Sequence, residues 1–140
     1  MIIIKDILDI DTDIIVHQVN CVGSMGKGLA LSIRKQYPIV YEKYKAHTWV
    51  LGRIQPVQVS DRLWVINLCG QVGCNENQRM TSYDALKVAW PKIQEWANGK
   101  RVHAPWMFGC GLGGGDWSIV RPLVESACPD VIWCKLPLTE

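Results

Sequence analysis

Glycine-rich segments are the parts of this sequence whose residue types most directly suggest chemistry. Eight of the twelve glycines lie in residues 20–28 and 108–116. Each segment follows a predicted strand and leads into a predicted helix, so its backbone N–H groups can converge on a phosphate or pyrophosphate. Glycines also serve tight turns, but the five in the second segment exceed what a turn needs. The two segments together predict a phosphate-bearing ligand lying between them.

Neither segment matches a common nucleotide-binding fingerprint. The first has its glycines at Gly23, Gly26 and Gly28, which reverses the G-x-G-x-x-G order of Rossmann dehydrogenases. Lys27 is followed by glycine, where a P-loop requires Ser or Thr to hold magnesium. The sequence therefore disfavours both a Rossmann dehydrogenase and a P-loop nucleotide hydrolase.

Metal ligands are also not indicated by the sequence. His17, His47 and His103 are far apart, and none belongs to a pair with ligand spacing. The six cysteines include no C-x-x-C pair and lie in apolar or glycine-rich surroundings. We therefore expect buried thiols rather than disulfides or a zinc site, and we expect no metal and no cofactor.

Alternating strands and helices must position these loops. Apolar, β-branched runs predict strands, and apolar residues at helical spacing predict helices. A hairpin is expected near residues 59–62, a kink or break at Pro91, and helix caps at Thr81 with Asp84 and at Asp116. The pattern indicates an α/β sandwich. The predicted strands are 2–4, 14–19, 54–59, 63–68, 102–105 and 131–136, and the predicted helices are 28–37, 39–46, 82–97 and 118–127.

Length, composition and charge narrow the classes of protein. The 140 residues suit one domain, and 49% hydrophobic with 20% charged residues argues against disorder. A net charge of +2 is too small for the basic surface of a nucleic-acid-binding protein. No apolar run approaches the ~20 residues of a membrane span, and the acidic start does not suit a signal peptide. We expect a cytoplasmic protein that is a monomer and does not contact a membrane.

Several segments, taken in order, resemble the macro domains that bind ADP-ribose. They are residues 13–20 (DIIVHQVN), 25–30 (MGKGLA) with Tyr37-Pro38, 67–71 (NLCGQ), 83–86 (YDAL) and 109–117 (GCGLGGGDW). The sequence looks closest to the bacterial and phage branch that processes ADP-ribose-1''-phosphate, which is related to terminal ADP-ribose glycohydrolases and to DNA ADP-ribosyl glycohydrolase antitoxins. The resemblance implies that residues 1–140 are a single macro domain of α/β class, with a mixed central β-sheet sandwiched between helices in three α/β/α layers.

The same resemblance assigns residues to parts of ADP-ribose. It implies that Asp6 and Ile7 bind adenine and that Asn20 contacts the distal ribose. The first loop would wrap the distal ribose and one phosphate, and the second loop would bind the other phosphate. Trp106 and Trp117 could supply flat apolar walls. The complete expected ligand-binding set is Asp6, Ile7, Asn20, Gly23, Met25, Gly26, Lys27, Gly28, Gln71, Gly109, Cys110, Gly111, Leu112, Gly113, Gly114 and Gly115.

One departure from the resembled family bears on mechanism. Glycohydrolase relatives that use covalent lysine chemistry carry a lysine near the end of the strand that residues 66–71 occupy, and an acid where this chain has Gly113. Both are missing here, so a Schiff-base route is disfavoured. Catalysis would instead use an activated water, with His17 or Asp116 as the base and Asn20 orienting the sugar. His17 could equally be a buried core histidine, and Asp116 simply a helix cap.

Three functions remain open at this stage. The first is a phosphatase that removes the 1''-phosphate of ADP-ribose-1''-phosphate. The second is a non-catalytic module that binds ADP-ribose. The third is a hydrolase that removes ADP-ribose from a protein or nucleic acid, which is ranked last because a DNA-linked substrate favours a more basic surface. We expect the partner to be ADP-ribose or its 1''-phosphate, with an ADP-ribosylated macromolecule as the alternative.

Overall fold

A six-stranded mixed sheet forms the centre of the protein. The computed structural model describes residues 1–73 and 79–138. Every neighbouring pair of strands is parallel except β3 and β4, which form the predicted hairpin. The strand order is β1-β6-β5-β2-β4-β3, with β1 (Ile2–Ile4), β2 (Asp13–Asn20), β3 (Ile54–Gln58), β4 (Leu63–Gln71), β5 (Val102–Pro105) and β6 (Ile132–Lys135).

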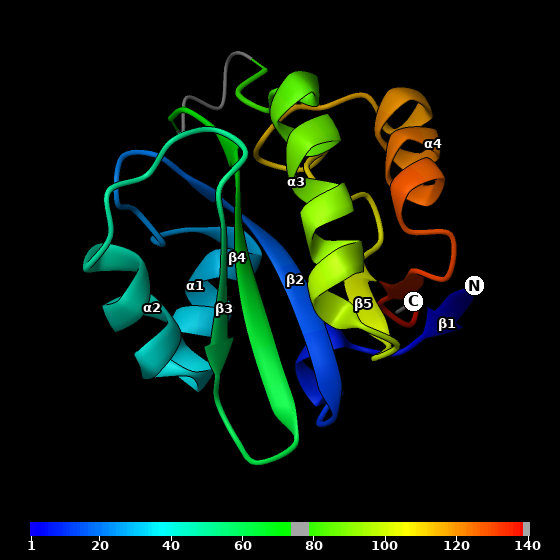
Figure 1. Ribbon diagram of the computed structural model, residues 1–140, viewed down its shortest axis with the longest axis horizontal. Coiled ribbons are helices and arrows are strands. Elements are labelled where there is room, and N and C mark those ends of the chain that lie inside the picture. The colour runs from blue at the N-terminus through cyan, green and yellow to red at the C-terminus, as the bar shows by residue number, and fades with distance from the viewer. Residues whose placement is uncertain (74–78, 139–140) are drawn as a thin grey trace.

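Helices cover both faces of the sheet (Figure 1). α1 (Gly28–Gln36) and α2 (Pro38–Lys45) lie on one face, and α3 (Tyr83–Ala97) and α4 (Trp117–Ala127) lie on the other. Ile14 and Val16 of β2 belong to the apolar core beneath α3 and α4, whereas Ile15 and Val19 belong to the core beneath α1 and α2. Because alternate residues of a strand point to opposite faces, β2 is apolar on both. The predicted three-layer α/β/α fold is confirmed.

The predicted elements are all present, with ends shifted by few residues. The largest difference is β4, which continues to Gln71 because it keeps pairing with β2 as far as Asn20. A short 3-10 helix, η1 (Ile7–Asp9), was not predicted; the Asp6 carboxylate caps it by accepting a hydrogen bond from the Leu8 N–H at 3.0 Å. Within residues 1–73 and 79–138, no helix is long and apolar enough to cross a membrane.

The structure corrects two local predictions in α3. Of the kink or break expected at Pro91, the break does not occur, since the helix is continuous from Tyr83 to Ala97. Pro91 and Lys87 are both exposed, so water can bind the Lys87 carbonyl that Pro91 leaves without a donor. The N-cap is Ser82 rather than Thr81: the Ser82 hydroxyl accepts from the Ala85 N–H at 3.1 Å. Asp116 does cap α4, as predicted.

The cysteines of the described ranges are thiols. Cys69, Cys128 and Cys134 are buried, as predicted, whereas Cys21 and Cys110 are half-buried. Cys74 lies outside the described residues. Burial raises the pKa of the Cys110, Cys128 and Cys134 thiols to about 11. These groups are therefore protonated, weak nucleophiles at neutral pH.

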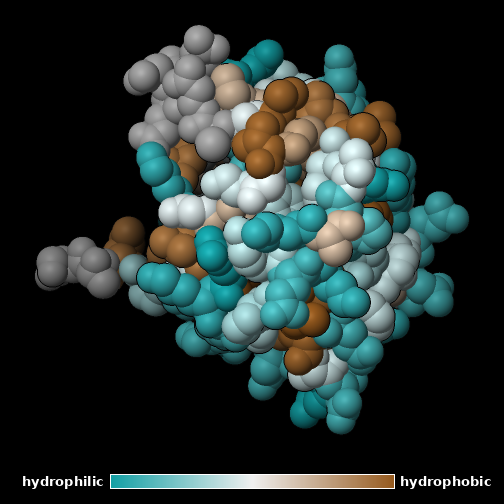
Figure 2. All heavy atoms as spheres, turned by 90° about the vertical axis from the view of Figure 1, so that its left-hand side faces the viewer, coloured by the Kyte–Doolittle hydropathy of each residue, from teal (hydrophilic) through white to brown (hydrophobic). Residues whose placement is uncertain are grey.

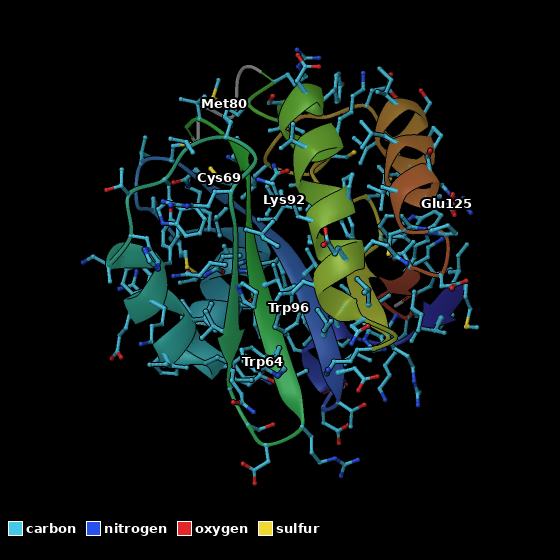
Figure 3. The ribbon with its side chains drawn as sticks, viewed as in Figure 1. Trp64, Cys69, Met80, Lys92, Trp96 and Glu125 are labelled. Carbon is cyan, nitrogen blue, oxygen red and sulfur yellow. The ribbon has the colours of Figure 1, made fainter. Side chains whose placement is uncertain are left out.

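One edge of the sheet gathers both glycine-rich segments. Trp64 and Cys69 mark the two ends of β4 in Figure 3. At the amino end, the Trp64 ring packs edge-on against Trp96 of α3, with centroids 5.0 Å apart. At the carboxyl edge, the chain leaves β2 toward α1 on one face, and it leaves the adjacent β5 toward α4 on the other. Open α/β sheets bind ligands where neighbouring strands diverge in this way.

Candidate functional site

A cavity of about 490 Å³ opens at this carboxyl edge, between the two glycine-rich segments. Its volume suits a small-molecule site. The four lining residues contributed by β2 and β4, which are His17, Gln18, Asn20 and Gln71, are called the cavity floor below. The remaining lining residues are Ser24, Gly26, Lys27, Gly28, Leu29, Ala30, Pro105, Trp106, Met107, Phe108, Gly109, Gly111, Leu112 and Gly113.

The surface near this edge is partly apolar. Figure 2 turns α1 and α2 toward the reader, and a large group of hydrophobic side chains lies toward the top, at the end of the sheet where the parallel strands have their carboxyl termini. Met107 and Leu112, which line the cavity, remain 43% and 46% exposed. An apolar rim around polar backbone groups is typical of a binding pocket.

Asn20 fixes the shape of the first glycine-rich loop. Its Oδ1 accepts hydrogen bonds from the Val22 N–H at 3.0 Å and the Ser24 N–H at 3.2 Å, and its Nδ2 donates to the Ser24 carbonyl at 2.8 Å. The Tyr44 hydroxyl lies 2.7 Å from the same Oδ1 and accepts from the Gly23 N–H. Burial raises the pKa of Tyr44 to about 12, so the hydroxyl stays protonated. One Asn20 Nδ2 hydrogen has no acceptor among the described residues and is available to a ligand.

The second glycine-rich loop folds back on itself and leaves a run of amides unused. The N–H groups of Gly114 and Gly115 donate to the carbonyls of Gly111 and Gly109, at 3.1 and 2.9 Å. Within residues 1–73 and 79–138, the N–H groups of Gly111, Leu112 and Gly113 donate to no protein acceptor. Three consecutive amides beside a cavity can bind an anion.

Gln18 and Gln71 form a polar cluster in the cavity floor. The Gln71 Nε2 donates to the Gly73 carbonyl at 2.5 Å, which leaves the Gln71 Oε1 to accept from the Gln18 Nε2 at 2.8 Å. Thr81 donates to the Gly109 carbonyl at 2.7 Å and accepts from the same Gln18 nitrogen at 2.9 Å. The Gln18 Oε1 is buried with no partner among the described residues. The floor therefore presents an unused acceptor.

His17 contributes a second unused acceptor to the floor. Its side chain is 1% exposed, and its Nε2 lies 2.5 Å from the Asn67 Oδ1. Burial lowers the pKa of His17 from 6.5 to about 4, against the opposing effect of the Asn67 hydrogen bond. The ring is neutral at pH 7, and its Nδ1 is buried without a partner in the described part of the chain.

Trp106 forms a flat wall of the cavity. Its ring centroid lies 5.1 Å from that of Trp117, which lies 4.9 Å from that of Trp133. The Arg121 guanidinium and the Lys135 ammonium lie 5.1 and 5.3 Å from the Trp106 centroid. Cation–π contacts of this kind hold the indole in place.

Comparisons with known proteins show which proteins this chain resembles. No protein-family model matches the chain. The DNA ADP-ribosyl glycohydrolase of Mycobacterium tuberculosis is 31% identical over 136 residues, which cover 90% of this chain and 38% of that protein. The chain thus spans well under half the length of the curated relatives it matches.

Solved structures agree with the sequence match. The macrodomain of M. tuberculosis DarG superposes with a TM-score of 0.78 at 28% identity, covering 99% of both chains. The chain is a macrodomain. Thermosipho africanus DarTG, solved in complex with ADP-ribose, shares the fold with a TM-score of 0.74 at 24% identity, covering 92% of this chain and 39% of that one.

Ten of the predicted site residues line the cavity of the macrodomain. They come from β2, β4 and both glycine-rich segments, which are far apart in sequence and meet only at the carboxyl edge of the sheet. Of the two predicted walls, Trp106 also lines it, whereas Trp117 packs edge-on against Trp106 and does not line it. The ten are His17, Asn20, Gly26, Lys27, Gly28, Gln71, Gly109, Gly111, Leu112 and Gly113.

The other eight predicted residues lie outside the cavity lining. Gly23, Cys110, Gly114 and Gly115 have their N–H groups bonded within the protein. Ile7 and Met25 are buried in the core beneath α1 and α2. The carboxylates of Asp6 and Asp116 accept hydrogen bonds from the amides of Leu8 and Ser118 as helix caps. The Ser118 hydroxyl also donates to Asp116, and this bond, followed by the one from the Ser118 amide, lowers the pKa of Asp116.

Some lining residues were missed by the sequence reasoning, namely Gln18, Ala30, Pro105, Met107 and Phe108. Gln18 carried a usable signal, since it is a polar residue within an apolar strand and adjacent to His17. Met107 has a left-handed backbone with φ of 66°, which residue type does not reveal. Within the described ranges, no group of three His, Cys, Asp or Glu side chains could hold a metal ion.

Gly113 must remain glycine for the second loop to close. A Cβ added there would lie 2.8 Å from the Gly109 carbonyl oxygen and closer still to the Thr81 hydroxyl. At Gly111, by contrast, a Cβ would meet no atom within 4 Å. We expect Gly113→Ala to lower the melting temperature clearly and Gly111→Ala to leave it nearly unchanged, measured by circular dichroism. Equal melting temperatures for the two variants would contradict the loop geometry.

The low pKa of His17 makes stability depend on pH. The unfolded chain binds a proton near pH 6.5 and the folded chain only near pH 4, so falling pH favours unfolding across this window. Relative to His17→Gln, the wild-type protein should lose up to about 3 kcal/mol of unfolding free energy between pH 7 and 4. Urea titrations at several pH values measure this. Parallel pH profiles for the two proteins would show that folding does not suppress His17 protonation.

Proposed function

We propose that this macrodomain binds ADP-ribose in the cavity at the carboxyl edge of the sheet. The observation that carries the proposal is the free run of amides from Gly111 to Gly113 beside a cavity whose floor offers buried hydrogen-bonding groups. The amides suit a pyrophosphate, and the floor suits the hydroxyl groups of a sugar. The ADP-ribose complex of T. africanus DarTG supports this choice of ligand.

The two ends of the ligand would then be recognised differently. The distal ribose would lie against the floor, within reach of the remaining Asn20 Nδ2 hydrogen. Adenine would extend toward the start of η1, where one Asp6 oxygen caps the helix and the other is left to accept from the exocyclic amine. The Ile7 N–H would meet a ring nitrogen. Asp6 lies beyond the cavity lining, so adenine would occupy the adjoining surface.

For chemistry, we infer hydrolysis of ADP-ribose-1''-phosphate by an activated water. Water would attack the 1''-phosphorus as the bond from phosphorus to the C1'' oxygen breaks, giving inorganic phosphate and ADP-ribose. The neutral His17 would take the proton from the attacking water, and this proton would then pass to the departing C1'' oxygen, which restores neutral His17. Asp116, the other candidate base, lies outside the cavity lining and caps α4.

A second candidate is removal of ADP-ribose from DNA. The 31% identity to the mycobacterial DNA ADP-ribosyl glycohydrolase favours it. Two observations argue against a lysine-based version of that reaction. The end of β4 carries Gln71 and no lysine, and Gly113 has no room for an acidic side chain. If this macrodomain releases ADP-ribose from DNA, it does so without that pair of groups.

Binding can be tested by placing a charge in the open space at Gly111. Gly111→Asp adds a carboxylate beside the proposed pyrophosphate, whereas Gly111→Asn adds a neutral group of nearly the same size. We expect ADP-ribose to bind the wild-type protein far more tightly than AMP does, and the Gly111→Asp change to cost about tenfold more affinity than Gly111→Asn. Isothermal calorimetry measures both. Equal affinities for ADP-ribose and AMP, or for the two variants, would reject the pyrophosphate site.

Turnover assays decide between the activities. We expect the protein to release inorganic phosphate from ADP-ribose-1''-phosphate in the presence of EDTA. The His17→Gln change should lower kcat far more than it lowers substrate affinity. ADP-ribosylated DNA and protein serve as parallel substrates. If the protein binds ADP-ribose but releases no phosphate from ADP-ribose-1''-phosphate, the phosphatase proposal is rejected. If it also releases no ADP-ribose from ADP-ribosylated DNA or protein, the macrodomain is a binding module.

A further inference from the structure

Three buried polar side chains form a row across β2, β4 and β3. His17 pairs with Asn67 in the register of β2 and β4, and Asn67 pairs with Gln55 in the register of β3 and β4. Their exposed fractions are 1%, 0% and 9%. The row lies beneath α2, since Asn67 and Gln55 donate to the carbonyls of Val40 and Lys43. Polar groups buried this deeply are costly unless each has a partner.

The direction of every hydrogen bond in the row follows from one backbone group. The Lys43 carbonyl can only accept, so the nitrogen of the Gln55 amide must be the group that faces it, at 2.9 Å. The Gln55 Oε1 is then the acceptor for the Asn67 Nδ2 at 3.0 Å. This leaves the Asn67 Oδ1 facing the His17 Nε2 at 2.5 Å.

The last bond of the row determines the tautomer of His17. An amide oxygen offers only lone pairs, so the ring hydrogen must be on Nε2, and in the neutral ring Nδ1 must then be an acceptor. That Nδ1 is buried and lacks a partner among the described residues, and His17 lines the cavity. The row therefore ends in one unused lone pair at the cavity floor.

We propose that Asn67 and Gln55 are positioning residues that hold His17 in the Nε2–H tautomer, so that its Nδ1 accepts a hydrogen from an O–H group of the ligand or of the attacking water. Neither residue lines the cavity. The identity of the ligand rests on the proposed function, whereas the tautomer is a property of the protein alone. The floor thereby selects a hydroxyl group over an ionised phosphate oxygen, which has no hydrogen to give.

The tautomer is measurable without any ligand. In ¹⁵N NMR spectra at pH 7, we expect His17 to carry its hydrogen on Nε2 with Nδ1 unprotonated. His103 provides an internal reference of the opposite kind, because its Nδ1 lies 2.9 Å from the Ile14 carbonyl oxygen and must donate to it. A His17 ring protonated on Nδ1, on both nitrogens, or on each in equal measure would overturn the proposal.

Variants test the positioning role. Asn67→Leu and Gln55→Leu should each increase the Nδ1–H form of His17 and weaken ADP-ribose binding, with about tenfold loss for Asn67→Leu. The exposed Gln58, on the same strand as Gln55, is the matched control, and Gln58→Leu should change neither quantity. An unchanged tautomer in folded Gln55→Leu excludes Gln55 from the role, and the same result in Asn67→Leu excludes both. If Asn67→Leu does not fold, Gln55→Leu and the wild-type spectrum remain decisive.

Adding ADP-ribose separates this proposal from the proposed function. We expect the His17 Nδ1 signal to move on binding while both His103 nitrogens stay in place. Binding that leaves the His17 Nδ1 signal unmoved overturns the acceptor role alone. Absence of any ADP-ribose binding overturns the proposed function and the ligand contact together, and leaves the tautomer measurement to judge Asn67 and Gln55.

Discussion

Parallel pairing of β2 with β4 is the constraint on which the cavity depends. The register runs from Asp13 opposite Leu63 to Asn20 opposite Gln71, with a shift between Val19 and Asn20. Both strands are buried on both faces, so a slip of one residue would move side chains from one core to the other and put His17 on the wrong face. This register sends His17 toward Asn67 and leaves Gln18 to meet Gln71. The loops only add backbone amides to a floor that the sheet has already arranged.

Hydrophobic periodicity was enough to predict the layers, because a strand covered on both faces must be continuously apolar. The glycine density likewise located both loops that border the cavity. Residue type could not show which amides are consumed inside the loops: Gly115 donates to Gly109, whereas Gly111 has no acceptor among the described residues, and both are glycine. Nor could it link Asn67 to His17 across fifty residues, since that contact exists only through strand pairing. The same limit applies at Asp6 and Asp116. A carboxylate at either position could cap a helix or bind a ligand, and residue type alone does not decide between the two roles.

The relation to the mycobacterial glycohydrolase is shown at the level of the fold. The fold is retained over nearly the whole chain, while the end of β4 carries an amide side chain, and Thr81 with Gly109 fills the space beside Gly113. Gln18, Gln71 and Thr81 occupy this region as a hydrogen-bonded set anchored on two backbone carbonyls, with the Gln18 Oε1 left without a partner among the described residues. A neutral cluster of this kind orients hydroxyl groups but offers no nucleophile. In the proposed phosphatase reaction, the nucleophile is therefore a water molecule rather than one of these side chains.

The indole array behind the cavity has a spectroscopic consequence. Trp106 borders the ligand space, and Trp117 and Trp133 follow it at centroid separations of 5.1 and 4.9 Å. Rings this close exchange excitation energy efficiently, so light absorbed deep in the core is emitted in part from the indole at the cavity wall. That wall indole also lies close to two cations, whose fields shift its emission. The macrodomain therefore carries its own optical reporter of cavity occupancy, coupled directly to the packing of its interior.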